Sequence, residues 1–268
     1  MPELAEVAFA AKAWKAGKGA LVTKVETRAE SRVFRDVSPA ALGRDLSGSV
    51  LLGHETHGKK MLFRFSEDGW LGLHLGMTGS LRREKADCRP VDRHDALVLR
   101  QEKRALVFRD PRQFGRVLFH QGPDAPEWWR DLPPAVTSAA FTLDLVRGAL
   151  ARRPRSPVKA ALLAQEIFPG VGNWMADEIL WRARIHPARP SGSLSRDKLR
   201  ALHEASVFVA QGALATVGER GGDPPEDWLF HVRWKDGGTC PATGKPLRRE
   251  EIAGRSTCWC PARQRAQR

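Results

Sequence analysis

The hydrophobic pattern of this chain changes from strand-like to helical spacing between about residues 120 and 139, and that change constrains the fold more than any other feature. From Leu21 to about His120, short alternating or apolar runs are separated by turn residues, which is typical of a β-sandwich or barrel. From about 139 to 217, apolar residues recur at helical spacing instead. The segment between them, QGPDAPEWWRDLPPAV at 121–136, holds four prolines and has no clear period. We therefore predict an α+β fold with two parts.

Individual runs locate the expected elements. An N-terminal helix is expected over 3–16, where Gly17 and Gly19 end it. The expected strands are Val50–Leu52, Met61–Phe65, Trp70–Leu75, Ala96–Leu99, Ala105–Phe108 and Arg116–Phe119. The expected helices are Leu143–Ala151, Val158–Glu166, Asn173–Ala183 and Lys198–Val217. The predicted organisation is an N-terminal β-sandwich domain (1–122), a linker (123–138), a helical domain (139–227) ending in a mobile loop (218–227), and a β-hairpin finger (228–268).

Charge indicates the kind of partner. Lys and Arg total 44 against 31 acidic residues, so the net charge is +13, which favours a polyanionic partner. The alternative is a generally basic protein from an Arg-rich proteome. No apolar run approaches the ~18 residues of a membrane span, and the N-terminus lacks the basic start of a signal peptide. We expect a monomeric cytoplasmic protein, associated with the bacterial nucleoid and not with a membrane.

Three of the four cysteines lie in the last 29 residues, which suggests a metal site or the remains of one. A structural zinc site needs four ligands in closely spaced pairs. However, Cys240 has Thr243 where a partner should be, and Cys260 has Arg263. Three cysteines together with His231 are the remaining alternative. We expect no metal ligand and no zinc or other cofactor.

The N-terminus carries the first candidate for chemistry. Met1 precedes the small residue Pro2, so removal of Met1 would free a secondary amine. Attack of such an amine on a sugar C1′ gives a cationic iminium, which promotes elimination of the 3′-phosphate. Glu3 could move protons during ring opening. The alternative is structural: Pro2 starts the helix and Glu3 complements its dipole.

Three turns in the N-terminal domain are candidates for DNA contact. In HETHGKKML (54–62), Gly58 permits a tight turn that presents Lys59 and Lys60 to a phosphate. In HLGMTGSLR (74–82), two glycines place Met77 on a sharp loop, where it could fill the gap left by an extruded base. In RDPRQFG (109–115), Arg112 and Phe114 could enter a base stack. The alternatives are a solvated basic turn, a core methionine and an ordinary surface turn with a core Phe.

Two further motifs lie in the C-terminal half. Within 159–189, a turn at Pro169–Gly172 precedes a helix that Asn173 opens, so that backbone N–H groups and the Asn173 amide would face an anion. The alternative is an ordinary helical hairpin. Within 240–264, a β-hairpin turns at Ala253-Gly254, and Arg255 could reach into DNA as a rigid fork.

In this order, the motifs resemble those of the formamidopyrimidine-DNA glycosylase and endonuclease VIII family over nearly all 268 residues. The resemblance implies that Pro2 is the nucleophile, Glu3 the general acid/base and Glu6 a supporting carboxylate. It favours Lys59 over Lys60 as the catalytic lysine. It implies that the following residues contact DNA: Met77, Arg112 and Phe114 in the duplex void, and His74, Lys159, Asn173 and Arg255 elsewhere.

The resemblance also implies a function. We expect a bifunctional glycosylase and abasic-site lyase that removes oxidised bases, with a preference for purines, through a Pro2 Schiff base and β,δ-elimination. Its partner would be double-stranded DNA that contains damaged bases or abasic sites. Two alternatives stay open: a preference for oxidised pyrimidines, and a non-catalytic binder of damaged DNA. The finger resembles that of zincless members, and we expect packing of Leu247, Ile252 and Trp259 to hold it.

Overall fold

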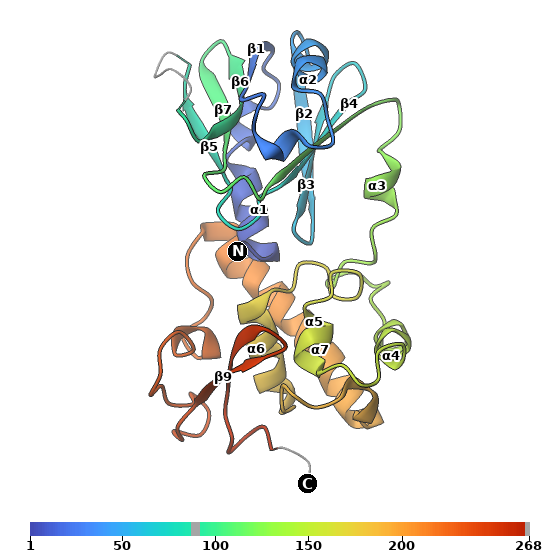
Figure 1. The fold of residues 1–268 in the computed structure, drawn as a ribbon, viewed down its shortest axis with the longest axis vertical. Helices are drawn as coiled ribbons and strands as arrows, with labels where there is room; N and C mark the ends of the chain where they lie inside the picture. Colours follow the sequence, from blue (N-terminus) through green and yellow to red (C-terminus); the bar gives the residue numbers. More distant parts are fainter. Residues whose placement is uncertain (87–91, 266–268) are drawn as a thin grey trace. The chain divides into compact units, whose positions relative to one another are not determined.

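The computed structural model describes residues 1–86 and 92–265 and confirms an α+β fold (Figure 1). Cys88 lies outside the described residues. The chain forms two compact units, one of Met1–Pro2 with Glu6–Leu132 and the other of Glu3–Ala5 with Pro133–Arg268. The boundary after Leu132 lies within the proline-containing segment. The helical region and the finger belong to the same unit.

The first unit is a β-sandwich, as the alternating runs predict. One antiparallel sheet has the order β1 (Val22–Thr27), β6 (Asp95–Gln101), β7 (Arg104–Arg109) and β5 (Ser80–Lys85). The other has the order β2 (Leu51–His57), β3 (Lys60–Phe65), β4 (Gly69–His74) and β8 (Arg116–Gln121). Side chains from both sheets share one core, in which Phe63 and Phe108 are fully buried. The inner faces therefore hold the unit together through apolar burial.

Three elements of this unit do not stand out in the sequence. The strands β1 and β5 lie at the edges of their sheet and carry mostly polar side chains, so they lack an apolar run. The helix α2 (Pro39–Leu46) begins after Ser38, whose side chain accepts a hydrogen bond from the Ala41 amide. It buries Leu42 and Leu46. A helix this short presents only two turns of periodicity, which explains why the pattern is weak.

The helical part of the second unit contains α4 (Leu143–Ala151), α5 (Val158–Leu162), α6 (Asn173–Ala183) and α7 (Arg196–Ala213), the last continued by a π-helical segment, Leu214–Gly218. The bounds of α4 and α6 agree with the prediction, whereas α5 ends four residues before Glu166. Its end follows from Gln165, whose side chain bonds the Leu163 and Val171 carbonyls and the Gly170 amide, and so forms the turn before α6. The chain also forms α1 (Leu4–Lys12) and α3 (Glu127–Arg130).

The finger is the expected β-hairpin, formed by β9 (Arg248–Ile252) and β10 (Arg255–Trp259). Its two-residue turn has φ of 52° at Ala253 and 71° at Gly254, as the right-handed twist of a tight hairpin requires. Of the residues expected to hold it, Leu247 belongs to a buried cluster with Trp181 and the three C-terminal cysteines. Ile252 and Trp259 are buried outside that cluster.

Among the described residues, no helix combines the length and apolar character needed to cross a membrane.

Candidate functional site

In the second unit, the Glu3 carboxylate occupies the N-terminus of α6. It accepts hydrogen bonds from the backbone amides of Gly172 (2.9 Å), Trp174 (3.0 Å) and Met175 (3.2 Å). Glu3 is 2% exposed, and these bonds together with the helix dipole stabilise its charge there. The anion that we expected at this helix start is therefore the carboxylate of Glu3, a residue of the chain itself.

Local geometry makes this arrangement dependent on glycine. A Cβ atom at Gly172 would lie 2.3 Å from the Cδ atom of Glu3, so any side chain would displace the carboxylate. The Leu4 amide also donates to the Gly170 carbonyl at 3.0 Å. Residues 3 and 4 are thus fastened to the turn that precedes α6.

Asn173 connects the start of α6 to the finger. Its Nδ2 atom donates to the Ser256 carbonyl at 2.8 Å, whereas its Oδ1 atom is buried without a hydrogen-bond partner among the described residues. The amide expected to hold a phosphate is thus bound to β10 in this structure. Arg255, the neighbour of Ser256, is exposed at the start of β10.

The structure corrects the prediction that Lys159 contacts DNA. Lys159 is fully buried, forms an ion pair with Asp177 and donates to the Asn173 carbonyl at 2.8 Å. Its ammonium therefore cannot reach a phosphate in this conformation. Burial lowers the pKa of Lys159, and the Asp177 carboxylate opposes that effect.

Sequence reasoning missed Asp177 and Arg233, which complete this buried network. Asp177 also accepts hydrogen bonds from the Arg233 guanidinium, the shorter at 2.5 Å, and from the Cys258 amide at 3.0 Å. One carboxylate therefore joins α5, α6, the segment after η5 (Leu229–His231) and β10. In the sequence, Asp177 is visible only as an acidic residue in the helix that begins at Asn173. Its partners are distant in the chain, so no local pattern indicates the network.

In the first unit, the residues predicted to fill the duplex void are exposed on two loops. We call these residues, Met77, Arg112 and Phe114, the wedge residues. Met77 is 43% exposed and follows Gly76, whose φ is +63°, so it is not a core residue. Phe114 is 47% exposed, and the Arg112 guanidinium lies 4.7 Å from the centroid of its ring. The stacking holds a cation and an aromatic ring together on one loop.

Asp110, at the start of the second loop, holds these two loops together. Its carboxylate accepts a hydrogen bond from the Thr78 hydroxyl at 3.1 Å and one from the Gly115 amide at 2.6 Å. A Cβ atom at Gly76 would lie 2.5 Å from the carbonyl carbon of Phe114, so the loops touch through their backbones. The wedge residues are therefore carried by one connected structure.

The two candidate lysines at the β2–β3 turn differ in their exposure. Gly58 has a φ of +56° at the tip, after which Lys59 is 9% exposed and Lys60 is exposed. Nearby, the Nδ1 atom of His74 accepts a hydrogen bond from the Gly76 amide at 3.1 Å. Burial, followed by the positive charges of Lys59 and Lys60, lowers the pKa of His74 to about 4. His74 is thus neutral near pH 7 and carries its proton on Nε2.

The remaining candidates, Pro2 and Glu6, belong to the first unit and are both partly exposed. Glu6 lies in the first turn of α1, and Pro2 directly precedes Glu3 in the chain. The structure therefore gathers the site residues in two groups. The first unit holds the wedge loops with His74 and Lys59, and the second holds Glu3, Asn173 and Arg255.

Comparisons with known proteins show which family this chain belongs to. Residues 1–117 match the family model of the formamidopyrimidine-DNA glycosylase N-terminal domain, and residues 132–221 match that of its H2TH domain. A formamidopyrimidine-DNA glycosylase of Roseiflexus sp. is 36% identical over 282 residues, covering 99% of this chain and all of the relative. One of Thermus thermophilus is 35% identical over 81% of this chain and 83% of its own length.

Two solved structures of the Lactococcus lactis protein show the same fold. One is a complex with DNA containing an oxidised pyrimidine, with a TM-score of 0.89 at 27% identity over 99% of this chain and all of that chain. The other contains abasic-site DNA, with a TM-score of 0.89 at 27% identity over 98% and all of the two chains. Both matched domains are those of formamidopyrimidine-DNA glycosylases, so the chain has the domain organisation of that class of enzyme. Our chain belongs to the formamidopyrimidine-DNA glycosylase family.

Proposed function

We propose that this protein is a DNA glycosylase of base excision repair that also cleaves the backbone at abasic sites. The observation that carries the proposal is the Glu3 carboxylate, fixed by three amides of α6 directly after Pro2 in the chain. The names of the relatives support the glycosylase reaction, and the Lactococcus complexes support damaged or abasic duplex DNA as partner. The net charge of +13 suits a polyanion.

The proposed reaction begins with removal of Met1, which frees the Pro2 amine. The Pro2 nitrogen attacks C1′ of the extruded nucleotide, the glycosidic bond breaks, and the base leaves with a proton. Opening of the sugar ring at O4′ gives an iminium between Pro2 and C1′. Loss of a C2′ proton then expels the 3′-phosphate by β-elimination, and loss of the C4′ proton expels the 5′-phosphate by δ-elimination. Water finally hydrolyses the iminium and frees the Pro2 amine.

The other residues have supporting roles in this proposal. Glu3 takes up a proton, passes it to O4′ during ring opening, and as a carboxylate then accepts a proton from the sugar. The hydrogen bonds from three backbone amides fix where this happens. Lys59 assists at the sugar or its phosphate, and Glu6 supports the Pro2 amine. The remaining roles concern DNA: Met77, Arg112 and Phe114 fill the void of the extruded base, and His74, Asn173 and Arg255 bind phosphates.

Trapping tests the chemistry. Borohydride should reduce the iminium of the wild-type protein on abasic-site DNA and give a covalent protein–DNA adduct. Pro2→Gly should bind the same DNA with little trapping, because glycine presents a primary amine in a different geometry. If the two proteins trap and cleave equally, Pro2 is incidental; if neither forms an adduct, the chain is a binder of damaged DNA.

We further propose a preference for oxidised purines, based on the resemblance of the N-terminal and Met–Arg–Phe motifs. The second candidate is an oxidised pyrimidine, because a Lactococcus relative has been captured with such DNA. Cleavage of matched duplexes that carry 8-oxoguanine, formamidopyrimidine or thymine glycol discriminates the two. Faster cleavage of the thymine glycol duplex would reverse the proposed preference.

We also propose that the finger works without zinc, because its residues do not fit a tetrahedral site. The Arg263 guanidinium lies 4.7 Å from the Trp181 ring, and the indole N–H of Trp181 donates to the Cys240 sulfur at 3.2 Å. Among the residues that the structure describes, no three His, Cys, Asp or Glu side chains are grouped so that they could hold a metal ion. His231 bonds the Pro224 carbonyl at 2.9 Å. One equivalent of tightly held zinc in the purified protein would contradict the proposal.

A further inference from the structure

The outer face of the second sheet carries side chains in cross-strand rows. In one row, Lys60 of β3 lies opposite His74 of β4, which lies opposite Arg116 of β8. The next row on the same face places Gly72 at its centre, because residues two apart share a face of a strand. A row of basic residues thus borders a position that has no side chain.

A cavity of about 430 Å³ lies over these two rows, within the first unit. Its lining includes all three residues of the basic row, together with Arg35, Phe114 and Trp128. Pockets that bind organic ligands commonly measure about 300–1,000 Å³. The cavity is therefore large enough for one nucleotide.

Gly72 and Trp128 create the aromatic wall of this cavity. A Cβ atom at Gly72 would lie 2.5 Å from the Cη2 atom of Trp128, so the indole rests on the sheet where a side chain would otherwise stand. Phe114, which is 47% exposed, lines the same cavity. Aromatic surface next to cations is the combination that binds an unpaired base and its phosphate.

The charges around the cavity are not balanced. Asp36 pairs with Arg116 at 2.6 Å and lies 3.7 Å from Arg35. Among the described residues, neither a hydrogen bond nor an ion pair engages the ammonium of Lys60. Three cations therefore face one carboxylate beside a neutral His74, and a phosphate would restore the balance.

We propose that this cavity, the Lys60–Trp128 pocket, binds one unpaired nucleotide of the DNA, with its phosphate against Lys60 and Arg116 and its base against Trp128. The proposal rests on the proposed function and adds a subsite to it. Phe114 then fills the duplex void and also borders the nucleotide in this pocket. The ligand that fits this pocket is one in which an anionic group is joined to a flat aromatic ring.

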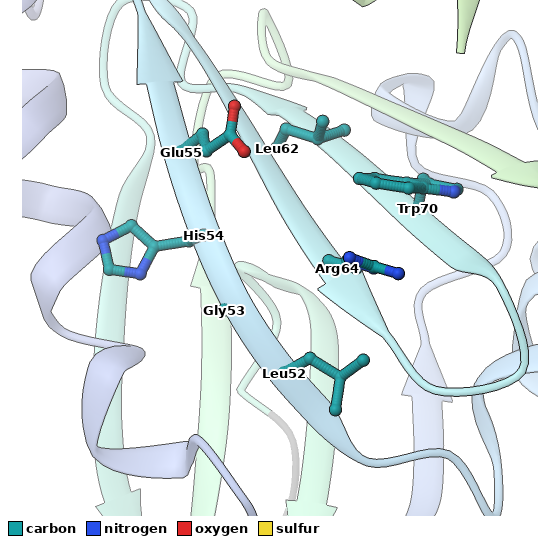
Figure 2. A pocket seen from close by; sticks show the side chains of 7 residues that line it. All are labelled: Leu52, Gly53, His54, Glu55, Leu62, Arg64 and Trp70. Atoms are coloured by element: carbon teal, nitrogen blue, oxygen red, sulfur yellow. The ribbon is translucent and has the colours of Figure 1, made fainter. Parts of the chain in front are cut away.

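A second hollow on the same sheet provides a control. Figure 2 shows Glu55, Arg64 and Trp70 at this hollow, with the His54 ring pointing away from Arg64 and Trp70. Here the Arg64 guanidinium already lies 5.1 Å from the centroid of the Trp70 ring, and the acid Glu55 is part of the lining. Its cation and ring are occupied with each other, so we expect no nucleotide there. Arg64 and Lys60 are both exposed residues of β3.

The experiment measures binding of a duplex that carries one unpaired 2-aminopurine nucleotide, over a series of salt concentrations. Loss of one phosphate contact should reduce the slope of log K against log salt by about 0.9. We expect that reduction for Lys60→Met and none for Arg64→Met. Trp128→Leu should keep the slope and lose the quenching of 2-aminopurine that stacking produces in the wild-type complex.

An unchanged slope for Lys60→Met would overturn the proposal, whatever Trp128→Leu does. Quenching that survives in a folded Trp128→Leu protein would also overturn it. Borohydride trapping of the wild-type protein separates this outcome from failure of the proposed function. If the wild-type protein forms an adduct and the Lys60→Met slope is unchanged, only the proposed pocket is wrong. If no adduct forms but the Lys60→Met slope is reduced, the proposed catalysis is wrong and the nucleotide site stands.

Discussion

At the scale of single residues, Glu3 is held by a contact that its place in the sequence does not indicate. Its position in the sequence suggests that it complements the dipole of its own helix. The structure instead directs its carboxylate to the amides of α6, which follow it by about 170 residues in the chain. A buried carboxylate is tolerated there because three N–H donors replace the water that it loses. Any change at this contact should therefore affect both stability and catalysis.

The first prediction concerns the glycine beneath Glu3. Gly172→Ala places a Cβ atom 2.3 Å from the Cδ atom of Glu3 and should destabilise the protein by about 1–3 kcal/mol while slowing excision. Gly148→Ala is the control, because that position in α4 is open, and there alanine should stabilise by about 0.5–1 kcal/mol. Thermal denaturation and single-turnover excision measure both effects. Wild-type behaviour of Gly172→Ala would show that Glu3 is not held tightly.

At the scale of elements, the two wedge loops behave as one structure because Asp110 bonds to both. Asp110 is 2% exposed, and its two oxygens accept from Thr78 of one loop and Gly115 of the other. The loops also meet through their backbones at Gly76 and Phe114. Met77 and Phe114 are thus positioned relative to each other before any DNA arrives, which lowers the ordering cost of binding.

The second prediction removes this connection. Asp110→Ala leaves the Gly115 amide without its acceptor and should cost about 2–4 kcal/mol, since each buried unsatisfied group costs about 1–3 kcal/mol. Thr78→Val removes one bond and should cost less. Asp110→Asn should restore most of the stability, because a rotated amide can accept from Gly115 and donate to Thr78. Thermal denaturation ranks the three variants, and amide exchange at 112–115 reports the loop; an asparagine as damaging as alanine would contradict this account.

At the scale of the whole molecule, stability should depend on pH through a buried acid in the second unit. Glu178 bonds to Arg182 at 2.7 Å, but its Oε2 atom has no hydrogen-bond partner among the described residues. Burial raises the pKa of Glu178 from its ordinary value of 4.5 to about 7, against the opposing effect of Arg182. The folded protein therefore holds this proton more tightly than the unfolded chain does.

The third prediction follows from this upward shift of the Glu178 pKa in the folded protein. The stabilisation linked to Glu178 is complete below about pH 4.5 and is lost as the pH rises through about 7. Relative to Glu178→Gln, the wild-type free energy of unfolding should fall by up to about 3 kcal/mol between pH 4.5 and 8, since one pKa unit corresponds to about 1.4 kcal/mol. Urea denaturation of both proteins across this range measures the difference. A difference independent of pH would show that folding does not shift the pKa of Glu178.

Much of the architecture was determined by the sequence itself. The bounds of α4 and α6 follow from helical spacing, and β3, β4, β6, β7 and β8 coincide with alternating or apolar runs. Glycines with positive φ at 58, 76 and 254 mark turns that the sequence also indicates. These features are readable because each depends on a residue and its near neighbours, whose periodicity records which face of an element is buried.

Only the tertiary structure decided which polar groups meet. Lys159 is a basic residue in a DNA-binding motif by sequence, yet it is buried against Asp177, which also receives Arg233 and the amide of Cys258. Glu3, the bond between Asp110 and Thr78, and the pocket under Trp128 likewise depend on partners far along the chain. Local periodicity carries no information about such pairs, because the energy of a buried charge is set by whichever groups the folded chain brings around it.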